Sequence, residues 1–122
     1  MIVSKNNTPL GDGGNHYKWG NDCDGWVLVD TDALSVKQER MPAQTSESLH
    51  YHEQAQQFFF ILKGIATFVV ENESYTVNAG QAFHIEPGKK HRIINNTAED
   101  IEFILSSQPS TNNDRFNIAP GP

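Results

Sequence analysis

The chain has little cysteine, few basic residues and no long apolar run. Cys23 is the one cysteine among 122 residues, so an internal disulfide framework is excluded and a reducing, cytoplasmic setting is expected. Lys and Arg number 9 against 15 Asp and Glu, and the net charge of −6 argues against binding to nucleic acid or an anionic membrane. No run approaches 18 apolar residues and residues 1–15 hold no apolar segment, so neither membrane spanning nor export is indicated.

The length suits one domain and is too short for two ordinary ones. Apolar residues make up 37% of the chain, which allows a sizeable but thin core. We predict an irregular arm over residues 1–25, because Gly, Asn and Asp are frequent there. A folded domain is expected over 26–106. Residues 107–122 are polar and rich in proline, and we expect them to form a surface tail.

Short strands separated by turn residues are predicted throughout the central part of the chain. A hairpin turn is expected at Glu71-Asn72-Glu73-Ser74. Helical periodicity is weak, with one faint possibility near 43–57. The pattern is typical of an all-β sandwich or barrel. The expected strands cover residues 26–29, 34–41, 58–62, 65–70, 75–77, 82–85, 91–94 and 101–105.

Histidines are the feature with most chemical content. In a strand, His50 and His52 would share one face about 7 Å apart, so both imidazoles could converge on one ion. Further residues follow His52 at regular spacing: Gln57 after four residues and Gly64 after six more. A second group of residues follows. Five residues separate Gly80 from Glu86, which Pro87 and Gly88 follow directly. Two residues then separate Gly88 from His91, and three separate His91 from Asn95.

These two groups resemble the two motifs of the cupin superfamily, H-x-H-x(3,4)-E-x6-G and G-x5-P-x-G-x2-H-x3-N. The 15 residues between Gly64 and Gly80 match the spacing of small single-domain microbial cupins. The resemblance covers residues 50–95 and implies a single jelly-roll β-barrel. It also implies a homodimer, for which the aromatic arm with Trp19 and Trp26 is a candidate interface. Two positions depart from the motifs: Gln57 stands for the usual Glu, and Glu86 for the first Pro.

Carried over by position, the resemblance implies His50, His52 and His91 as metal ligands. Gln57 takes the fourth ligand position, where its carbonyl could ligate the ion or orient a bound water. Three neutral imidazoles suit a divalent transition metal (Fe, Mn, Co, Ni, Cu or Zn) and do not suit Mg or Ca. An amide in place of a carboxylate leaves the full +2 charge on the ion. We expect a weaker but more Lewis-acidic site that favours an anionic substrate.

The same motifs imply structural roles for a few other residues. Gly64, Gly80 and Gly88 would serve turns that need positive φ or close backbone approach. Asn95 would cap a loop with its side chain.

The alternation of side chains along a strand predicts which residues surround the metal site. Phe59 and Ile61 share the face of Gln57 and would line the cavity, whereas Phe58 and Phe60 would face the second sheet or a partner subunit.

Two residues are catalytic candidates. Glu86 could be a general base at the cavity mouth or an exposed loop residue, and His84 could touch substrate or be exposed, depending on strand parity. Glu47 and Glu53 lack the motif spacing and are expected to be solvated charges. Cys23 has no activating neighbour in the sequence and is expected to be structural.

The sequence therefore predicts a metal-binding cupin acting on a small molecule, which could be anionic. A non-redox isomerase, cyclase or lyase acting on a sugar acid or hydroxy-carbonyl compound is favoured, because a Lewis acid needs positive charge and no redox tuning. The small uronate-cyclising cupins are similar in size. An Fe-dependent dioxygenase and a non-catalytic binding cupin are the alternatives, since this fold hosts many activities.

Overall fold

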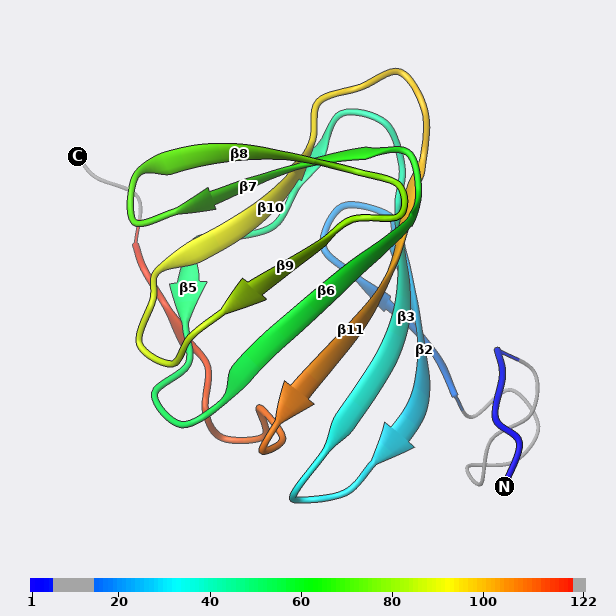
Figure 1. Cartoon of the computed structure of the whole chain (residues 1–122), viewed down its shortest axis with the longest axis vertical. Coiled ribbons are helices and arrows are strands. Elements are labelled where there is room, and N and C mark those ends of the chain that lie inside the picture. Colours follow the sequence, from blue (N-terminus) through cyan, green and yellow to red (C-terminus); the bar gives the residue numbers. More distant parts are fainter. Residues whose placement is uncertain (6–14, 120–122) are drawn as a thin grey trace.

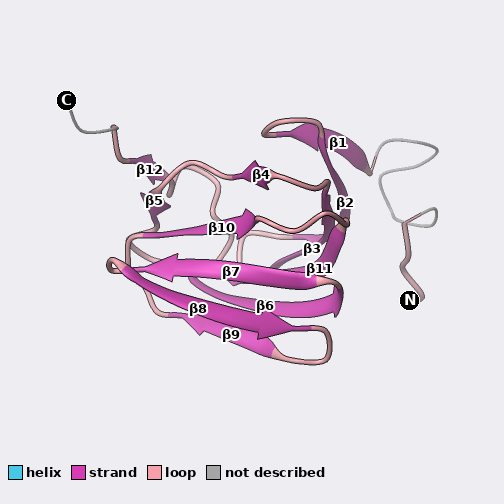
Figure 2. Cartoon of the chain, turned by 90° about the horizontal axis from the view of Figure 1, so that it is seen from above, coloured by secondary structure: helices cyan, strands magenta, loops and turns pink. Residues whose placement is uncertain are grey.

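The computed structural model describes residues 1–5 and 15–119, and these form strands, turns and loops without a helix (Figures 1 and 2). The faint helical possibility at 43–57 is therefore wrong. No helix in the described part of the chain is long and apolar enough to cross a membrane. The strands are β1 (His16–Trp19), β2 (Cys23–Asp30), β3 (Ser35–Met41), β4 (Thr45–Ser46), β5 (His50–Tyr51), β6 (Gln56–Lys63), β7 (Ile65–Val70), β8 (Glu73–Asn78), β9 (Ala82–Ile85), β10 (His91–Asn95), β11 (Ile101–Gln108) and β12 (Phe116–Asn117).

Two antiparallel sheets face one another, as Figure 1 shows. The first has the strand order β1-β2-β3-β11-β6-β9, and the second has the order β12-β5-β10-β7-β8, with β4 also paired to β10. Strands distant in sequence are thus neighbours in space; β3, for example, lies beside β11. The all-β, jelly-roll prediction is confirmed.

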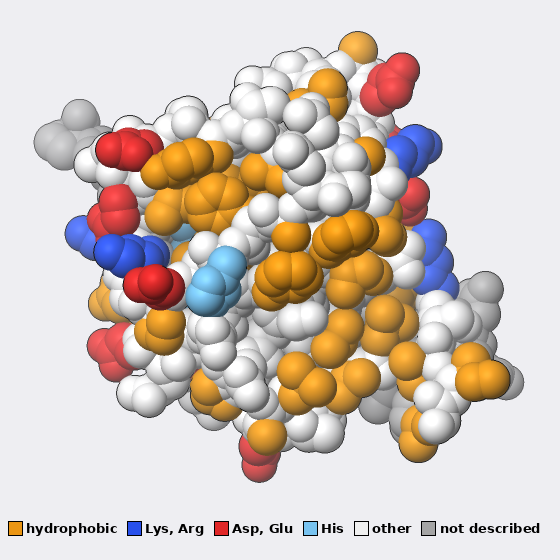
Figure 3. All heavy atoms as spheres, viewed as in Figure 1, with side chains coloured by type: hydrophobic (Ala, Val, Ile, Leu, Met, Phe, Trp, Pro, Cys, Tyr) orange, Lys and Arg blue, Asp and Glu red, His pale blue; other side chains and the backbone are white. Residues whose placement is uncertain are grey.

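Alternation along β6 divides its side chains between the core and the surface. Phe59 and Ile61 are buried on the inward face that they share with Gln57, as its parity predicted. Phe59 lines the cavity beside the histidines as expected, whereas Ile61 packs in the core and does not line it. Phe58 and Phe60 face the other way and are exposed, so they do not contact the second sheet. Figure 3 shows apolar side chains gathered on the outer face that carries β6.

Tight turns hold the strands in register. The hairpin between β7 and β8 turns at Glu71 and Asn72, whose φ values of 49° and 69° match the type I′ turn that suits a two-residue hairpin. Gly64, between β6 and β7, has a φ of 83°, and a Cβ there would lie 2.7 Å from the carbonyl oxygen of Asp100. This position therefore needs glycine for both conformation and space.

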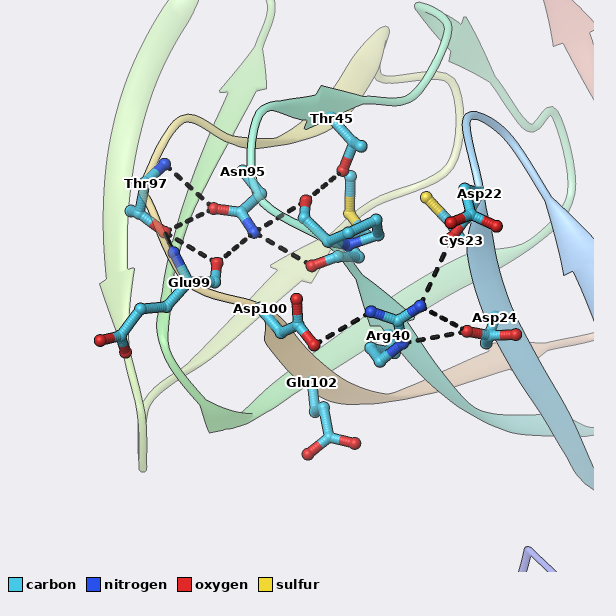
Figure 4. A network of polar contacts seen from close by, with 12 residues as sticks. Asp22, Cys23, Asp24, Arg40, Thr45, Asn95, Thr97, Glu99, Asp100 and Glu102 are labelled. Carbon is cyan, nitrogen blue, oxygen red and sulfur yellow. Dashed lines mark hydrogen bonds and ion pairs between the residues drawn. The ribbon is translucent and has the colours of Figure 1, made fainter.

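Asn95 ties the end of β10 to the neighbouring loops (Figure 4). It is buried, and its Nδ2 donates to the main-chain carbonyls of Met41 at 3.0 Å, Pro42 at 3.1 Å and Glu99 at 2.7 Å. Its Oδ1 accepts from the amide and hydroxyl of Thr97. The predicted loop-capping role of Asn95 is confirmed, and β10 is held where it carries His91.

A second polar contact joins β2, β3 and the start of β11 (Figure 4). Arg40 donates to the Asp24 carboxylate from Nε at 2.9 Å and Nη2 at 2.7 Å, and to Asp100 from Nη1 at 3.0 Å. Burial alone would raise the Asp24 pKa, but hydrogen bonds from His16, then Lys18 and Arg40, hold it well below its usual range.

Strands continue across both predicted domain boundaries. β2 begins at Cys23, so the first sheet starts inside the predicted arm, and β1 lies wholly within it. β11 runs to Gln108, and β12 pairs with β5 inside the predicted tail. The parts of the predicted arm and tail at residues 6–14 and 120–122 lie outside the described residues.

Candidate metal centre

The three predicted histidine ligands meet at one point between the sheets. His50 on β5 is paired in register with His91 on β10, and His52 follows β5 by one residue. All three are buried, and one ligand atom from each lies within 4.8 Å of the others. Strand pairing, rather than the H-x-H spacing alone, brings His91 to the other two.

Main-chain carbonyls orient every one of these rings. Nδ1 of His50 donates to the carbonyl of Ser48 at 2.7 Å, and Nδ1 of His91 donates to that of Lys89 at 2.8 Å. His52 donates in the same way to Asp114. A carbonyl only accepts, so each proton is on Nδ1 and each Nε2 has a free lone pair.

Burial keeps the three rings neutral. It lowers the pKa of His50 to about 3 and that of His91 to about 4, and it also lowers the pKa of His52. Nε2 of His52 is buried without a hydrogen-bond partner among the described residues. A buried, unpartnered lone pair beside the Nε2 atoms of two more neutral imidazoles is the donor set that a transition-metal ion needs.

Gln57 on β6 adds a fourth polar group. Its Nε2 donates to the Ser107 hydroxyl at 3.0 Å, which turns its Oε1 toward Nε2 of His91 at 3.1 Å. Because His91 carries its proton on Nδ1, both facing atoms are acceptors. Such a contact is favourable when a cation lies between them, so the arrangement fits a shared ion with Gln57 as a candidate ligand.

A cavity of about 170 Å³ opens beside the histidines. At about 30 Å³ per water, this is room for roughly six waters or one small metabolite. Besides His50, His52 and Gln57, its walls carry side chains of mixed charge and polarity, namely Tyr17, Trp19, Lys37, Glu39, Glu47 and Arg115.

Glu47 is not the solvated charge that the sequence suggested. Its side chain is 13% exposed and lines the cavity, with Oε1 accepting from the Ile93 amide at 3.2 Å and Oε2 3.9 Å from Nη1 of Arg115. Burial raises its pKa to about 8. Glu53, by contrast, is exposed as expected.

Glu39 on β3 is a cavity residue that sequence reasoning missed. It is 8% exposed, and its carboxylate accepts a hydrogen bond from the Tyr17 hydroxyl. Burial raises the pKa of Glu39 despite that hydrogen bond. The alternation of apolar and polar residues over 34–41 is imperfect, so only the pairing of β3 with β2 and β11 sets which of its side chains face inward.

The described residues that line this cavity do not include His84 or Glu86, the two catalytic candidates from the sequence. His84 is exposed, and its Nε2 is 2.8 Å from Oε1 of Gln56. Glu86 is exposed in the turn that follows β9. The structure therefore places both in the exposed positions that were their alternative interpretations.

The fold and the site together define a β jelly roll with a three-histidine centre beside a polar cavity. Residues 37–107 match the family described as "Cupin domain", and the chain belongs to that family. An uncharacterized protein of Methanocaldococcus jannaschii is 25% identical over 75 residues, which are 62% of this chain. The chain spans about 60% of the length of that relative.

Solved structures show the same fold. A predicted oxalate decarboxylase from Thermotoga maritima superposes with a TM-score of 0.78 and 20% identity, covering 90% of this chain and 100% of that one. A sugar phosphate isomerase of the cupin superfamily from Silicibacter pomeroyi gives a TM-score of 0.67 and 17% identity, covering 72% and 60%. At these identities the likeness concerns the fold.

Proposed function

We propose that the protein binds a divalent transition metal through His50, His52 and His91 and catalyses a non-redox isomerisation, cyclisation or lyase reaction. The substrate would be a small anionic sugar acid or hydroxy-carbonyl compound. The observation that carries this proposal is the convergence of three neutral, carbonyl-oriented imidazoles on one point beside a polar cavity.

The ligand set favours Lewis-acid chemistry. When bound, a divalent ion would polarise a carbonyl or hydroxyl oxygen of the substrate. Three imidazoles and an amide add no negative charge, so the ligands themselves leave the ion's charge unbalanced. The carboxylates of Glu39 and Glu47 lie on the walls of the cavity and outside the three-histidine cluster.

The cavity walls support an anionic, oxygen-rich substrate. Lys37 and Arg115 both line the cavity, and each offers a cation to a substrate carboxylate. The hydroxyl of Tyr17 and the carboxylate of Glu39 offer hydrogen bonds to substrate hydroxyl groups. Phe59 and Leu105 supply the apolar part of the wall.

The names of these two structural neighbours describe the same reaction types. A decarboxylase is a lyase, and a sugar phosphate isomerase moves a carbonyl group within a polyhydroxy anion. Neither names the substrate of this chain, but both support non-redox chemistry on a small anion.

Elemental analysis of protein purified without added metal tests the first part of the proposal. We expect stoichiometric transition metal in the wild type and its loss in the double variant His50→Ala/His91→Ala. The variant His84→Ala, which removes an exposed histidine, is the matched control and should keep its metal. If the wild type binds no metal even when metal is supplied, a metal-free binding protein replaces this proposal.

Oxygen uptake separates the two catalytic alternatives. Candidate hydroxy-carbonyl substrates should be converted without consumption of O₂, in air and under argon alike. Stoichiometric oxygen consumption would identify an Fe-dependent dioxygenase instead. Binding without turnover of any candidate would favour the non-catalytic alternative.

We also propose a homodimer, with the aromatic arm that carries Trp19 and Trp26 as its interface. Trp19 lines the cavity and its Nε1 donates to the carbonyl of Asp24 at 2.9 Å, so this tryptophan serves the fold and the cavity wall. Sedimentation velocity tests the proposal, and a monomer would contradict it.

A further inference from the structure

Three neighbouring strands place a tyrosine and a carboxylate together on the cavity wall. Tyr17 on β1 lies opposite Gly25 on β2, and Gly25 lies opposite Glu39 on β3. The ring of Tyr17 extends across Gly25, and its hydroxyl donates a hydrogen bond to Oε2 of Glu39. The two side chains therefore meet although a whole strand separates them.

Gly25 makes this contact possible. A Cβ at this position would lie 2.0 Å from Cζ and 2.4 Å from the hydroxyl oxygen of Tyr17. Any side chain would displace the tyrosine ring from Glu39, because these distances are far inside van der Waals contact. Tyr17 and Gly25 both lie outside residues 37–107, the region that matches the cupin domain.

Glu39 is free to act on a ligand in a way that Glu47 is not. Within the described part of the chain, Tyr17 is the hydrogen-bond partner of the Glu39 carboxylate, and Oε1 of Glu39 has none. Glu47 already accepts from the amide of Ile93 and lies beside Arg115. Glu39 is thus the buried carboxylate whose second oxygen is not engaged in holding the fold.

We propose that Glu39, positioned by Tyr17, is the proton-transfer residue of the cavity and that the substrate is a small α-hydroxy keto acid. This inference rests on the proposed function. Glu39 and Tyr17 line the same cavity as His50 and His52, so a carbonyl compound held at the histidines would present its neighbouring C–H bonds to this wall. Lys37 lines it too and matches the substrate carboxylate.

The step balances without an oxidant or reductant. The C–H bond next to the carbonyl breaks, and its electron pair forms the new C=C bond. The π pair of the carbonyl moves onto its oxygen, and the Glu39 carboxylate takes the proton. Return of the proton, after exchange with solvent, to the same carbon replaces its hydrogen by deuterium in D₂O. Return to the former carbonyl carbon gives the isomer when the neighbouring hydroxyl passes its proton to the former carbonyl oxygen and becomes the new carbonyl.

Hydroxypyruvate in D₂O is a suitable probe, because it carries a keto group, a carboxylate and an enolisable hydroxymethyl group. With Zn²⁺-loaded protein, ¹H NMR reports the rate at which the C3 protons are replaced by deuterium. We expect Glu39→Gln to lower kcat for exchange about 100-fold or more and Tyr17→Phe about tenfold, within the usual range for an acid–base residue and its partner. KM and Zn²⁺ affinity should stay within about threefold of the wild-type values, because neither substitution removes an interaction that binds the ground state and the transition state equally.

Glu86→Gln, which changes an exposed carboxylate, is the control and should exchange at the wild-type rate. Exchange within threefold of wild type in Glu39→Gln would overturn this inference and leave the proposed function standing. Loss of Zn²⁺ from Glu39→Gln would overturn it as well, because the residue would then act through the metal. A wild type that binds Zn²⁺ but exchanges no probe would overturn this inference alone. A wild type that binds no Zn²⁺ would overturn the proposed function and this inference with it. If Glu39→Gln does not fold, Tyr17→Phe decides, since its ring still covers Gly25.

Discussion

Asp114 holds His52 and the loop after it from a position 62 residues further along the chain. Its main-chain carbonyl accepts the Nδ1 proton of His52, and its carboxylate accepts the amides of Glu53 at 2.7 Å and of Gln54 and Ala55 at 3.0 Å. Burial alone would raise the Asp114 pKa, but these three amides hold it below its usual range. The segment after β11 therefore orients one of the three imidazoles.

Asp114→Asn should weaken metal binding. The carboxamide places an N–H donor against main-chain donors, so the loop and the carbonyl that orients His52 both shift. We expect about a 10- to 100-fold loss of affinity for Zn²⁺ or Co²⁺, the usual effect of removing a group that orients a ligand.

A competition titration with a chelator measures this loss, and the visible spectrum of bound Co²⁺ reports whether the histidine set changes. Asp30→Asn, at the exposed end of β2, is the control. Unchanged affinity and spectrum in a destabilised Asp114→Asn would mean that Asp114 serves the fold alone.

Gln57→Glu should strengthen metal binding. A carboxylate at this position adds a negative charge beside His91 and can still accept a hydrogen bond from Ser107. We expect at least about a tenfold higher affinity, equivalent to about 1.4 kcal/mol. Turnover should fall, because the added charge makes the ion a weaker Lewis acid.

Gln56→Glu is the matched control, since the neighbouring side chain on β6 points outward and bonds to Gln108. The same assays apply to both variants. Equal metal affinity in Gln57→Glu and wild type would show that Gln57 takes no part in the site.

Motif spacing predicted the cluster of three histidines, and strand alternation predicted the parity of β6. The spacing of residues within each motif is a short-range property of the sequence. Alternation along β6 likewise places Gln57, Phe59 and Ile61 on one face of the strand, independently of the rest of the chain.

The cavity walls depend on which strands pair, and no local pattern contains that information. Glu39 faces inward because β3 lies between β2 and β11, and Arg115 reaches the cavity because β12 pairs with β5. For Glu47 the residue type was misleading, because a carboxylate is usually exposed unless a fold supplies partners such as the Ile93 amide.

Asn95→Ala should destabilise the fold. The change leaves the carbonyl of Met41 and its neighbours without their buried donor and removes the acceptor for Thr97. We expect a loss of about 2–4 kcal/mol in the free energy of unfolding. Urea denaturation measures it, and Asn96→Ala, an exposed neighbour, should cost less than about 0.5 kcal/mol. Similar losses in the two variants would refute the capping role.

The metal-free protein should lose stability as the pH falls below about 6.5, the pKa of an unfolded histidine. In the folded state His50 titrates at about 3 and His91 at about 4, and the pKa of His52 is also lowered. The unfolded chain therefore binds protons that the folded chain does not. For each histidine, the free energy of unfolding falls by about 1.4 kcal/mol for each pH unit between its unfolded and its folded pKa.

Glu47 acts in the opposite direction, because burial raises its folded pKa to about 8 from about 4.5. Between these values the folded chain keeps a proton that the unfolded chain has lost, so stability falls as the pH rises. Burial raises the pKa of Glu39 too, so its contribution has the same sign. Above pH 6.5 the histidines no longer contribute, and Glu47 decides the slope. The free energy of unfolding should therefore be greatest near pH 6.5.

Glu47→Gln tests the fall in stability above pH 6.5, because the amide keeps an acceptor for the Ile93 amide and has no carboxyl proton to lose. Between pH 6.5 and 8 the free energy of unfolding of the wild type should fall, and urea denaturation measures that fall. In Glu47→Gln the fall should be smaller by on the order of 1 kcal/mol. Glu53→Gln, at an exposed position of the same loop region, should follow the wild-type curve. A Glu47→Gln curve parallel to that of the wild type would show that Glu47 is ionised in the folded protein at neutral pH, and that Arg115 compensates its burial.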